Sequence, residues 1–265
     1  MIPKMGTTSF RMTVVGCSGS YPGPDSPASC YLVQAEHAGR TWSLVVDLGN
    51  GALGALQRYV DPLEVDAVLL SHLHADHCVD MTSYYVLRKY HPHGTQPQIP
   101  VWGPSNTDVR LAHAYDLPIN TGMREEFEFH VFDAPFVVGP FEIEPYSVDH
   151  PVEAYGMRIS ADTDEHGRRT LAYSGDTGVT PALLDIAHEA DLFLCEASFR
   201  DGDDNPPSLH LTGAECGEAA AKSRVKRLVI THIPPWHDAQ RMLTESLGTF
   251  DGPTELAVQG AVYAI

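Results

Sequence analysis

Residues 65–77 read VDAVLLSHLHADH, an apolar run followed at once by three histidines and an aspartate. The apolar run predicts a buried strand, and on a continuing strand His72 and His74 would face the same side. A turn after them would direct Asp76 and His77 toward a second point. Such a group could hold two neighbouring metal ions, with zinc favoured and manganese or iron also compatible. The alternative is a polar loop that is rich in histidine by chance.

Further polar side chains lie at the ends of predicted elements downstream. His150, Asp176 and His232 each follow a predicted strand, and His210 precedes a predicted helix. Each of these residues alone is a weak signal, because a single histidine at a strand end is usually a structural residue. Together they supply the ligands that two metal ions beside the first motif would still lack.

Short β-branched or aromatic runs bounded by Gly, Pro, Asp or Asn predict eleven strands, and apolar periodicity predicts five helices. The predicted strands are Arg11–Val15, Ser29–Gln34, Leu44–Asp47, Ala67–Ser71, Gln98–Trp102, Glu126–Phe132, Phe141–Ser147, Tyr155–Ser160, Thr170–Ser174, Leu192–Cys195 and Arg227–Thr231. The predicted helices are Ala52–Val60, Met81–Tyr90, Pro181–His188, Gly213–Ser223 and Asp238–Ser246.

The order of these elements indicates an α/β protein. Strands dominate the first part, and strand–helix alternation dominates from Thr170 onward. Two sheets placed between outer helices would satisfy this pattern. The chain has 265 residues, 43% of them hydrophobic, and carries no low-complexity linker. We therefore expect one domain spanning residues 1–265.

The HLHADH motif and the downstream segments, taken in order, resemble the metal-ligand series of the metallo-β-lactamase superfamily. The resemblance covers nearly the whole chain and implies a single-domain, four-layer αββα sandwich with the metals at one edge between the sheets. The ligands that it implies are His72, His74 and His150 for one metal ion, Asp76, His77 and His232 for the other, and Asp176 bridging the two.

A narrower resemblance points to one branch of this superfamily. The segments GCSGS at 16–20, DLGNG at 47–51, EAS at 196–198 and HLT at 210–212 are similar to motifs of the ribonuclease Z-type branch. In that branch a glutamate pairs with a histidine, and the matching positions are Glu196 and His210. Longer strings, including DLGNGALGALQRY, LAYSGDTG and FLCEASF, resemble actinobacterial cyclic-AMP phosphodiesterases of this fold.

The resemblance implies hydrolysis of a cyclic nucleotide to a 5′-monophosphate, with two divalent cations as cofactors. Asp76 would ligate a metal and orient the attacking water. His210 would contact the phosphate and protonate the leaving 3′-oxygen, and Glu196 would hold the His210 ring. The structural alternatives are a surface role for His210 at a helix start and a surface carboxylate for Glu196. The residue patterns do not separate cyclic AMP from cyclic GMP or from 2′,3′-cyclic nucleotides.

Three other functions have to be weighed. A tRNA-processing nuclease of bacterial type would need a basic arm between its third histidine ligand and its bridging aspartate, yet His150 and Asp176 are only 176 − 150 = 26 positions apart. The net charge of −18 also repels polyanions, so we expect no nucleic-acid polymer as partner. A hydrolase of thioesters, sulfate esters or lactones would not need the Glu196/His210 pair. A non-catalytic binding module would be expected to have lost ligands.

The remaining sequence features concern compartment, assembly and base recognition. Five irregularly spaced cysteines favour reduced thiols, and no segment predicts a signal peptide or a membrane span, so we expect a cytoplasmic protein without a membrane partner. The resemblance to the ribonuclease Z branch implies a homodimer. Aromatic residues near the motifs are candidates to contact the base of a small-molecule cyclic nucleotide: Tyr21, Tyr84, Tyr85, Phe199 and Trp236.

Overall fold

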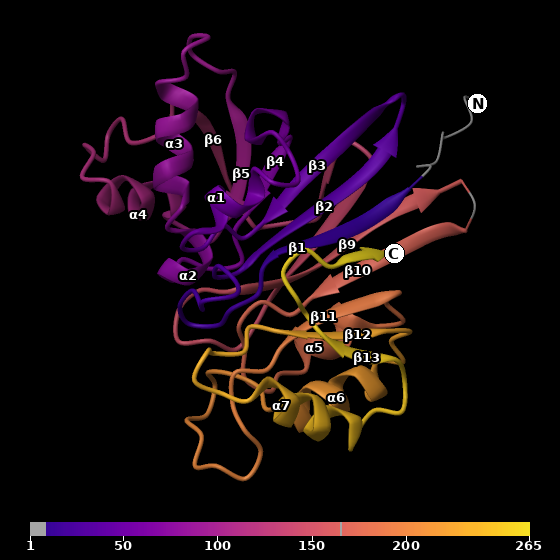
Figure 1. The fold of residues 1–265 in the computed structure, drawn as a ribbon. Helices are drawn as coiled ribbons and strands as arrows, with labels where there is room; N and C mark the ends of the chain where they lie inside the picture. Colours follow the sequence, from indigo (N-terminus) through magenta and orange to yellow (C-terminus); the bar gives the residue numbers. More distant parts are fainter. Residues whose placement is uncertain (1–8, 165) are drawn as a thin grey trace.

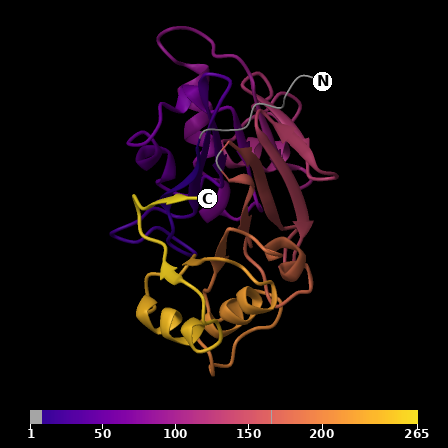
Figure 2. The ribbon, with the colours of Figure 1, turned by 90° about the vertical axis from the view of Figure 1, so that its right-hand side faces the viewer.

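Short segments rich in β-branched and aromatic side chains form most of the strands, and a computed structural model arranges them in two sheets (Figure 1). The structure describes residues 9–164 and 166–265, and within these ranges each sheet has seven strands. A quarter-turn of the molecule shows helices gathered on the outer sides of the sheets (Figure 2).

The first sheet has the strand order β14-β1-β2-β3-β4-β5-β6. Its strands are β1 (Phe10–Gly16), β2 (Cys30–His37), β3 (Arg40–Val46), β4 (Ala67–Leu69), β5 (Ile99–Gly103), β6 (Phe127–Val131) and β14 (Val262–Ala264). Strands β1 to β3 pair antiparallel, whereas β3 to β6 pair parallel, with helices in the connections. The last strand of the chain, β14, returns to pair with β1.

The second sheet has the order β13-β12-β11-β10-β9-β8-β7. Its strands are β7 (Phe136–Val138), β8 (Phe141–Ser147), β9 (Tyr155–Thr163), β10 (Gly167–Tyr173), β11 (Leu192–Glu196), β12 (Leu228–Thr231) and β13 (Thr254–Leu256). Strands β7 to β10 form an antiparallel meander, and β10 to β13 pair parallel.

The helices between these strands are short. They are α1 (Ala52–Leu56), the 3₁₀ turn η1 (Pro62–Glu64), α2 (Ala75–Cys78), α3 (Met81–Lys89), α4 (Thr107–Ala114), α5 (Ala182–Ala187), α6 (Gly213–Lys222) and α7 (Ala239–Leu247). Helix α6 begins with a capping box, because Thr212 and Glu215 each bond the other's backbone N–H. No helix in the described ranges is long and apolar enough to cross a membrane.

Three apolar clusters separate the layers. One lies between the two sheets and contains Val46 of β3 and Phe141 of β8. The second joins the first sheet to α1, α3 and α4 and contains Leu53, and the third joins the second sheet to α5, α6 and α7 and contains Ile186. The described residues therefore form a single α/β domain with four layers, helix–sheet–sheet–helix, which confirms the predicted architecture.

Strands that run in the same direction place their carboxyl ends at one edge of the sandwich. Strands β10, β11 and β12 are parallel to one another, and β8 has the same direction because both β8 and β10 are antiparallel to β9. The loops that follow β4, β8, β10 and β12 carry the residues predicted to bind metal. This edge therefore gathers side chains that are far apart in the sequence.

All eleven predicted strands and five predicted helices are present among the described residues, with small shifts at their ends. One boundary is wrong in a way that matters: β4 ends at Leu69, so Ser71 and the histidines after it do not continue the strand. Strand–helix alternation, which was predicted to dominate from Thr170 onward, is not confined to that part of the chain. The first sheet already contains it, from β3 through α1, β4, α3, β5 and α4 to β6.

Candidate metal centre

The HLHADH motif begins in irregular backbone and ends in the short helix α2. His74 is the N-cap of α2 in extended conformation, which turns the chain so that Asp76 and His77 lie in the first helical turn. The expectation that His72 and His74 share one face of a strand is wrong, because the strand has already ended. The loop nevertheless brings the rings together, with His72 Nε2 3.1 Å from His74 Nδ1.

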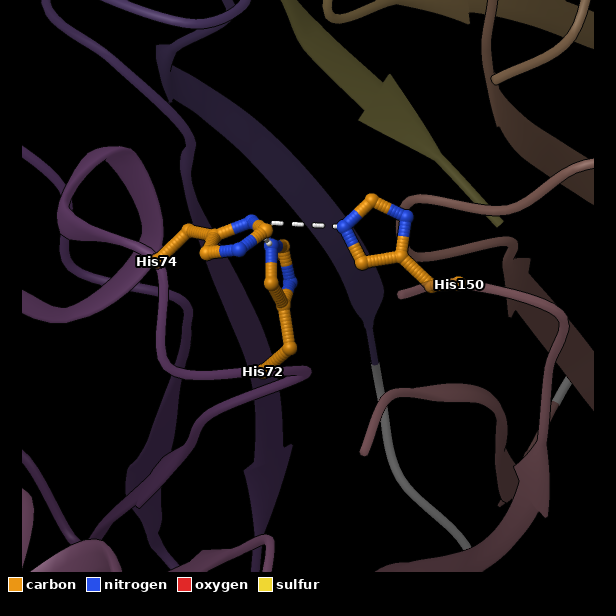
Figure 3. A group of neighbouring side chains, drawn as sticks. All are labelled: His72, His74 and His150. Carbon is orange, nitrogen blue, oxygen red and sulfur yellow. Dashed lines mark hydrogen bonds between the residues drawn. The ribbon is translucent and has the colours of Figure 1, made fainter. Parts of the chain in front are cut away.

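The first group of ligand atoms belongs to His72, His74 and His150, and these atoms all lie within 4.8 Å of one another. His150 comes from the loop after β8, and its Nε2 atom lies 3.3 Å from His74 Nδ1. Figure 3 shows the three rings pointing toward one another from two separate segments of the chain. Three imidazole nitrogens that converge in this way could hold one metal ion.

The second group consists of Asp76, His77, Asp176 and His232, all buried and again with ligand atoms within 4.8 Å of one another. The Nε2 atoms of His77 and His232 are 3.1 Å apart, and Asp76 Oδ2 is 3.1 Å from His232 Nε2. His232 follows β12 with φ +57°, a backbone conformation that costs energy for a residue with a side chain. The fold holds this strained residue where it can complete a second metal site.

Asp176 lies between the two groups. Its Oδ2 atom is 3.8 Å from His72 Nε2 in the first group and 3.4 Å from His232 Nε2 in the second, and its Oδ1 atom is 3.3 Å from His77 Nε2. The preceding Gly175 has φ +59°, and a Cβ atom there would lie 2.5 Å from the carbonyl oxygen of Tyr155. A glycine is therefore required for the turn that places Asp176 in a bridging position.

Hydrogen bonds on the far side of four histidine rings fix their tautomers. His150 Nδ1 donates to the carbonyl oxygen of Leu209 at 3.0 Å. His232 Nδ1 lies 2.8 Å from the Ser198 hydroxyl, which itself donates to the His232 carbonyl oxygen and so must accept from the ring. These contacts leave the Nε2 lone pairs directed at the centre, as metal-binding histidines require.

The buried carboxylate of Asp47 fixes the tautomers of the His77 and His72 rings, directly for His77 and through Ser71 for His72. It accepts from His77 Nδ1 and from the Ser71 hydroxyl, each at 2.8 Å, and the Ser71 oxygen lies 3.1 Å from His72 Nδ1. Tyr173, which belongs to the opposite sheet, also donates to Asp47 at 2.8 Å. The DLGNG motif alone does not predict this role for Asp47, because only the fold shows which residues it contacts.

Glu196 and His210 form the predicted pair. His210 Nδ1 lies 2.9 Å from Glu196 Oε1, and the backbone amides of Thr177 and Ser198 each donate to the Glu196 carboxylate at 3.0 Å. Glu196 ends β11 and is fully buried, so the alternative of a surface carboxylate is wrong. His210 Nδ1 is 4.0 Å from Asp176 Oδ2, which places the pair beside the metal-ligand candidates.

Burial and charge set the protonation of these groups. Burial lowers the pKa of His72, His74 and His150, so their rings are neutral near pH 7 and offer a lone pair. Burial acts in the same direction on His210, but the Glu196 carboxylate outweighs it and raises the pKa of His210 to about 9. The His210 ring is therefore protonated at neutral pH.

The carboxylates of the second group stay ionised despite their burial. Burial alone would raise the pKa of Asp176, but the neighbouring rings of His232, His77 and His72 hold the pKa well below its usual value. Burial would likewise lower the pKa of His77, yet the carboxylates of Asp176 and Asp47 raise it well above normal. The same negative charges would favour a cation at this point.

The donor set fits divalent cations. Asp47, Asp76, Asp176 and Glu196 are buried, and no described Lys or Arg forms an ion pair with any of them. Asp176 Oδ1 is buried and accepts no hydrogen bond from the described residues. Buried carboxylates without basic partners are costly unless a cation balances them. Imidazole and carboxylate together suit zinc, manganese or iron, and their convergence here could hold two ions.

The aromatic candidates for base contact fall into two classes. Tyr84 and Tyr85 are buried in the cluster between the first sheet and its helices, so they cannot contact a substrate at the site edge. Tyr21 and Trp236 are exposed, and Phe199 is half-buried with its ring against His210.

Comparison with known proteins adds independent findings. The sequence model of the beta-lactamase superfamily domain matches residues 43–233. A Mycobacterium tuberculosis protein described as uncharacterized is 46% identical over 255 residues, covering 94% of this chain and 90% of that protein. Ribonuclease Z of Myxococcus xanthus is 27% identical, with coverage of 95% and 96%.

A solved structure matches the architecture described above. The metallo-β-lactamase fold protein YhfI of Bacillus subtilis superimposes with a TM-score of 0.83 at 28% identity, covering 97% of this chain and all (100%) of that one. In the sequence comparison YhfI is described as a probable metallo-hydrolase, and the alignment spans 96% of this chain and 99% of YhfI. Both the sequence and the arrangement of elements are thus similar to metallo-hydrolases.

Proposed function

The chain belongs to the beta-lactamase superfamily as a metallo-hydrolase of that fold, and from this premise we propose that it is a phosphodiesterase that hydrolyses 3′,5′-cyclic AMP to 5′-AMP. The observation that carries the proposal is the hydrogen-bonded pair of Glu196 and His210 beside Asp176. A sugar alkoxide is a poor leaving group and needs a proton, and a histidine held protonated beside the ligand groups can supply one.

Two cations are part of this proposal. The residues that would hold them are His72, His74 and His150 for the first, Asp76, His77 and His232 for the second, and Asp176 for both. When bound, the cations would supply a nucleophile from water near neutral pH and would neutralise charge on the phosphoryl oxygens. Zinc is the ion that we favour, with manganese or iron as alternatives.

The side chains of the chain itself would then guide the reaction. Asp76 would orient the attacking water through one carboxylate oxygen, so that oxygen bonds to phosphorus opposite the 3′-oxygen. As the bond from phosphorus to that oxygen breaks, His210 would transfer its proton to the 3′-oxygen. Glu196 would hold the ring and support its positive charge through the 2.9 Å hydrogen bond.

A small substrate suits the molecule better than a large one. The net charge of −18 disfavours a long polyanion, whereas bound cations can still attract a small phosphodiester locally. Between His150 and Asp176 the residues that the structure describes form only a loop and the hairpin of β9 and β10, and they include no arm at the position expected for bacterial tRNA enzymes. The similarity to a ribonuclease Z keeps RNA 3′-processing as the second candidate.

The experiment is an assay of the metal-loaded protein against 3′,5′-cyclic AMP and GMP, 2′,3′-cyclic AMP and a precursor tRNA. We expect 5′-AMP from 3′,5′-cyclic AMP and no processing of the tRNA. Hydrolysis of the tRNA alone would establish the second candidate. Absence of any phosphodiester cleavage, with both cations bound, would overturn the assignment to phosphodiesters.

A further inference from the structure

Two large aromatic side chains stand exposed next to each other in the described structure. The exposed fraction is 40% for Tyr21 and 61% for Trp236, and their ring centroids are 5.1 Å apart with an angle of 33° between the rings. Exposed aromatic rings that lie side by side commonly mark a binding surface, whereas single scattered ones do not. Covering such rings with a ligand removes apolar surface from water, which is favourable.

The pair adjoins the second metal-ligand group. Tyr21 directly follows Ser20, whose backbone N–H lies 3.4 Å from His232 Nε2. Trp236 follows His232 by 236 − 232 = 4 positions. The two segments are joined next to the site, because Gly19 N–H donates to the Ile233 carbonyl oxygen at 3.1 Å. Both rings therefore stand on loops that border His232.

Both loops are held by close backbone contacts. A Cβ atom on Gly19 would lie 2.2 Å from the carbonyl oxygen of His232, so the two backbones touch at this point. Residues 234–237 form a turn closed by a 2.9 Å hydrogen bond from His237 N–H to the Pro234 carbonyl oxygen. Pro235 occupies the second position of that turn, where its fixed φ is favourable. The surface is therefore largely formed before a ligand binds.

The polar edge of Trp236 already has a partner. Its indole Nε1–H donates to His237 Nε2 at 3.1 Å, and burial lowers the pKa of His237, which keeps that ring neutral and able to accept. The face of the Trp236 ring therefore remains available to contact a ligand. A face binds a flat aromatic group by stacking, which depends on ring area rather than on a particular hydrogen-bond pattern.

We propose that Tyr21 and Trp236 form the platform on which the base of the nucleotide stacks while its phosphate lies at the metal-ligand groups. The inference rests on the proposed phosphodiesterase function and adds the residues that recognise the base. Because stacking carries the recognition, adenine and guanine should be bound similarly, and both better than a pyrimidine of smaller ring area.

A cavity lined in part by His210 offers a competing location for the base. It has a volume of about 310 Å³, and Phe199, Asn205 and Pro206 line part of it. Its walls come mostly from the loop between β11 and α6, with Asp149, Gly178 and Val179 from the loops after β8 and β10, and neither Tyr21 nor Trp236 lines it. Substitution of Phe199 therefore distinguishes the two locations.

The test compares 3′,5′-cyclic AMP with ribose 3′,5′-cyclic phosphate, which has the same phosphodiester and no base. For Trp236→Ala we expect the ratio of kcat/KM for cyclic AMP to that for the base-free ester to fall about 10-fold or more, mainly through KM. Tyr21→Ala should give a smaller fall, and Trp236→Phe should restore most of the ratio. Tyr90→Ala is the matched control, because Tyr90 is 65% exposed and follows α3, away from these loops.

A binding measurement separates this inference from the proposed function. Calorimetric titration of the metal-loaded protein with 5′-AMP and with ribose 5-phosphate should show that the base strengthens binding in the wild type and not in Trp236→Ala. This result would support the platform even if no cyclic nucleotide were hydrolysed. An unchanged ratio and an unchanged preference for 5′-AMP in Trp236→Ala, or loss of both in Phe199→Leu instead, would overturn it.

Discussion

His77 shows how a single residue is prepared for its role in the site. Its Nδ1 atom donates to the buried Asp47 carboxylate at 2.8 Å, so the Nε2 atom faces the other ligand candidates. The same carboxylate accepts from Ser71 and Tyr173. One aspartate thus fixes a ring and ties the two sheets together beneath the centre, which is how residues behind a metal's ligands commonly tune its affinity.

Asp47→Asn should weaken metal binding. The substitution replaces one carboxylate oxygen with an amide NH₂ group among four donors, so the orientation of the His77 ring is no longer enforced. We expect the affinity for zinc, measured by competition with a chelator, to fall by about 10- to 100-fold. Asp61→Asn, at an exposed position before η1, serves as the control. Equal affinity in the Asp47 and Asp61 variants would refute the role of Asp47.

His210→Ala should lose activity in a way that depends on the leaving group. For cyclic AMP, whose leaving alkoxide needs a proton, we expect kcat to fall by about 10²- to 10⁴-fold. For bis(p-nitrophenyl) phosphate, whose leaving group is stable without a proton, the fall should be much smaller. Metal content should stay the same, as in the control His113→Ala at an exposed position in α4. An equal loss with both substrates would assign His210 to phosphate binding rather than proton transfer.

At the residue scale, the sequence predicts the site residues that belong to recognisable motifs. All seven predicted ligand candidates meet at one edge of the sandwich, and Glu196 contacts His210 as expected. The partners of Asp47 could not be read from the sequence, because Tyr173 lies 173 − 47 = 126 positions away and belongs to the other sheet. Contacts of this kind depend on how the two sheets face each other, and a local sequence pattern does not predict that arrangement.

At the scale of elements, the site depends on where strands stop. Strands β4, β10 and β12 end just before HLHADH, Asp176 and His232, and each ligand is carried by the irregular residues that follow. Rigid strands set the position of each loop, and short loops leave the side chains little freedom. This arrangement explains why ligands from distant parts of the chain can converge to within 4.8 Å.

Gly175→Ala tests the turn after β10. The new Cβ would meet the Tyr155 carbonyl oxygen at 2.5 Å and would also adopt a φ of +59°. We expect a loss of about 2–4 kcal/mol in the free energy of unfolding, measured by urea titration, together with weaker metal binding. Gly167→Ala is matched, because its φ is +70° with nothing within 4 Å, and should cost only about 1 kcal/mol. Similar losses in both variants would show that crowding at Gly175 is unimportant.

The three strands that the sequence did not reveal share a physical cause. Strands β7, β13 and β14 have three residues each, too few for a periodic pattern to stand out. They form because neighbouring strands offer free hydrogen-bonding groups at the sheet edges. Strand β4 was predicted too long, since Leu70 and Ser71 continue the buried run although the ladder has ended.

At the scale of the whole molecule, negative charge and a buried ligand cluster act together. A chain of net charge −18 repels long polyanions, and cations at the cluster would make one point attractive to a small phosphate ester. The homodimer implied by the resemblance to the ribonuclease Z branch stays a prediction. It can be checked by light scattering of the purified protein at several concentrations.

Anomalous X-ray diffraction from crystals of the zinc-loaded protein tests the central claim most directly. The account predicts two strong zinc peaks per chain, one in contact with His72, His74 and His150, the other with Asp76, His77 and His232, and both within reach of Asp176. A single peak, no peak, or peaks at other residues would contradict it.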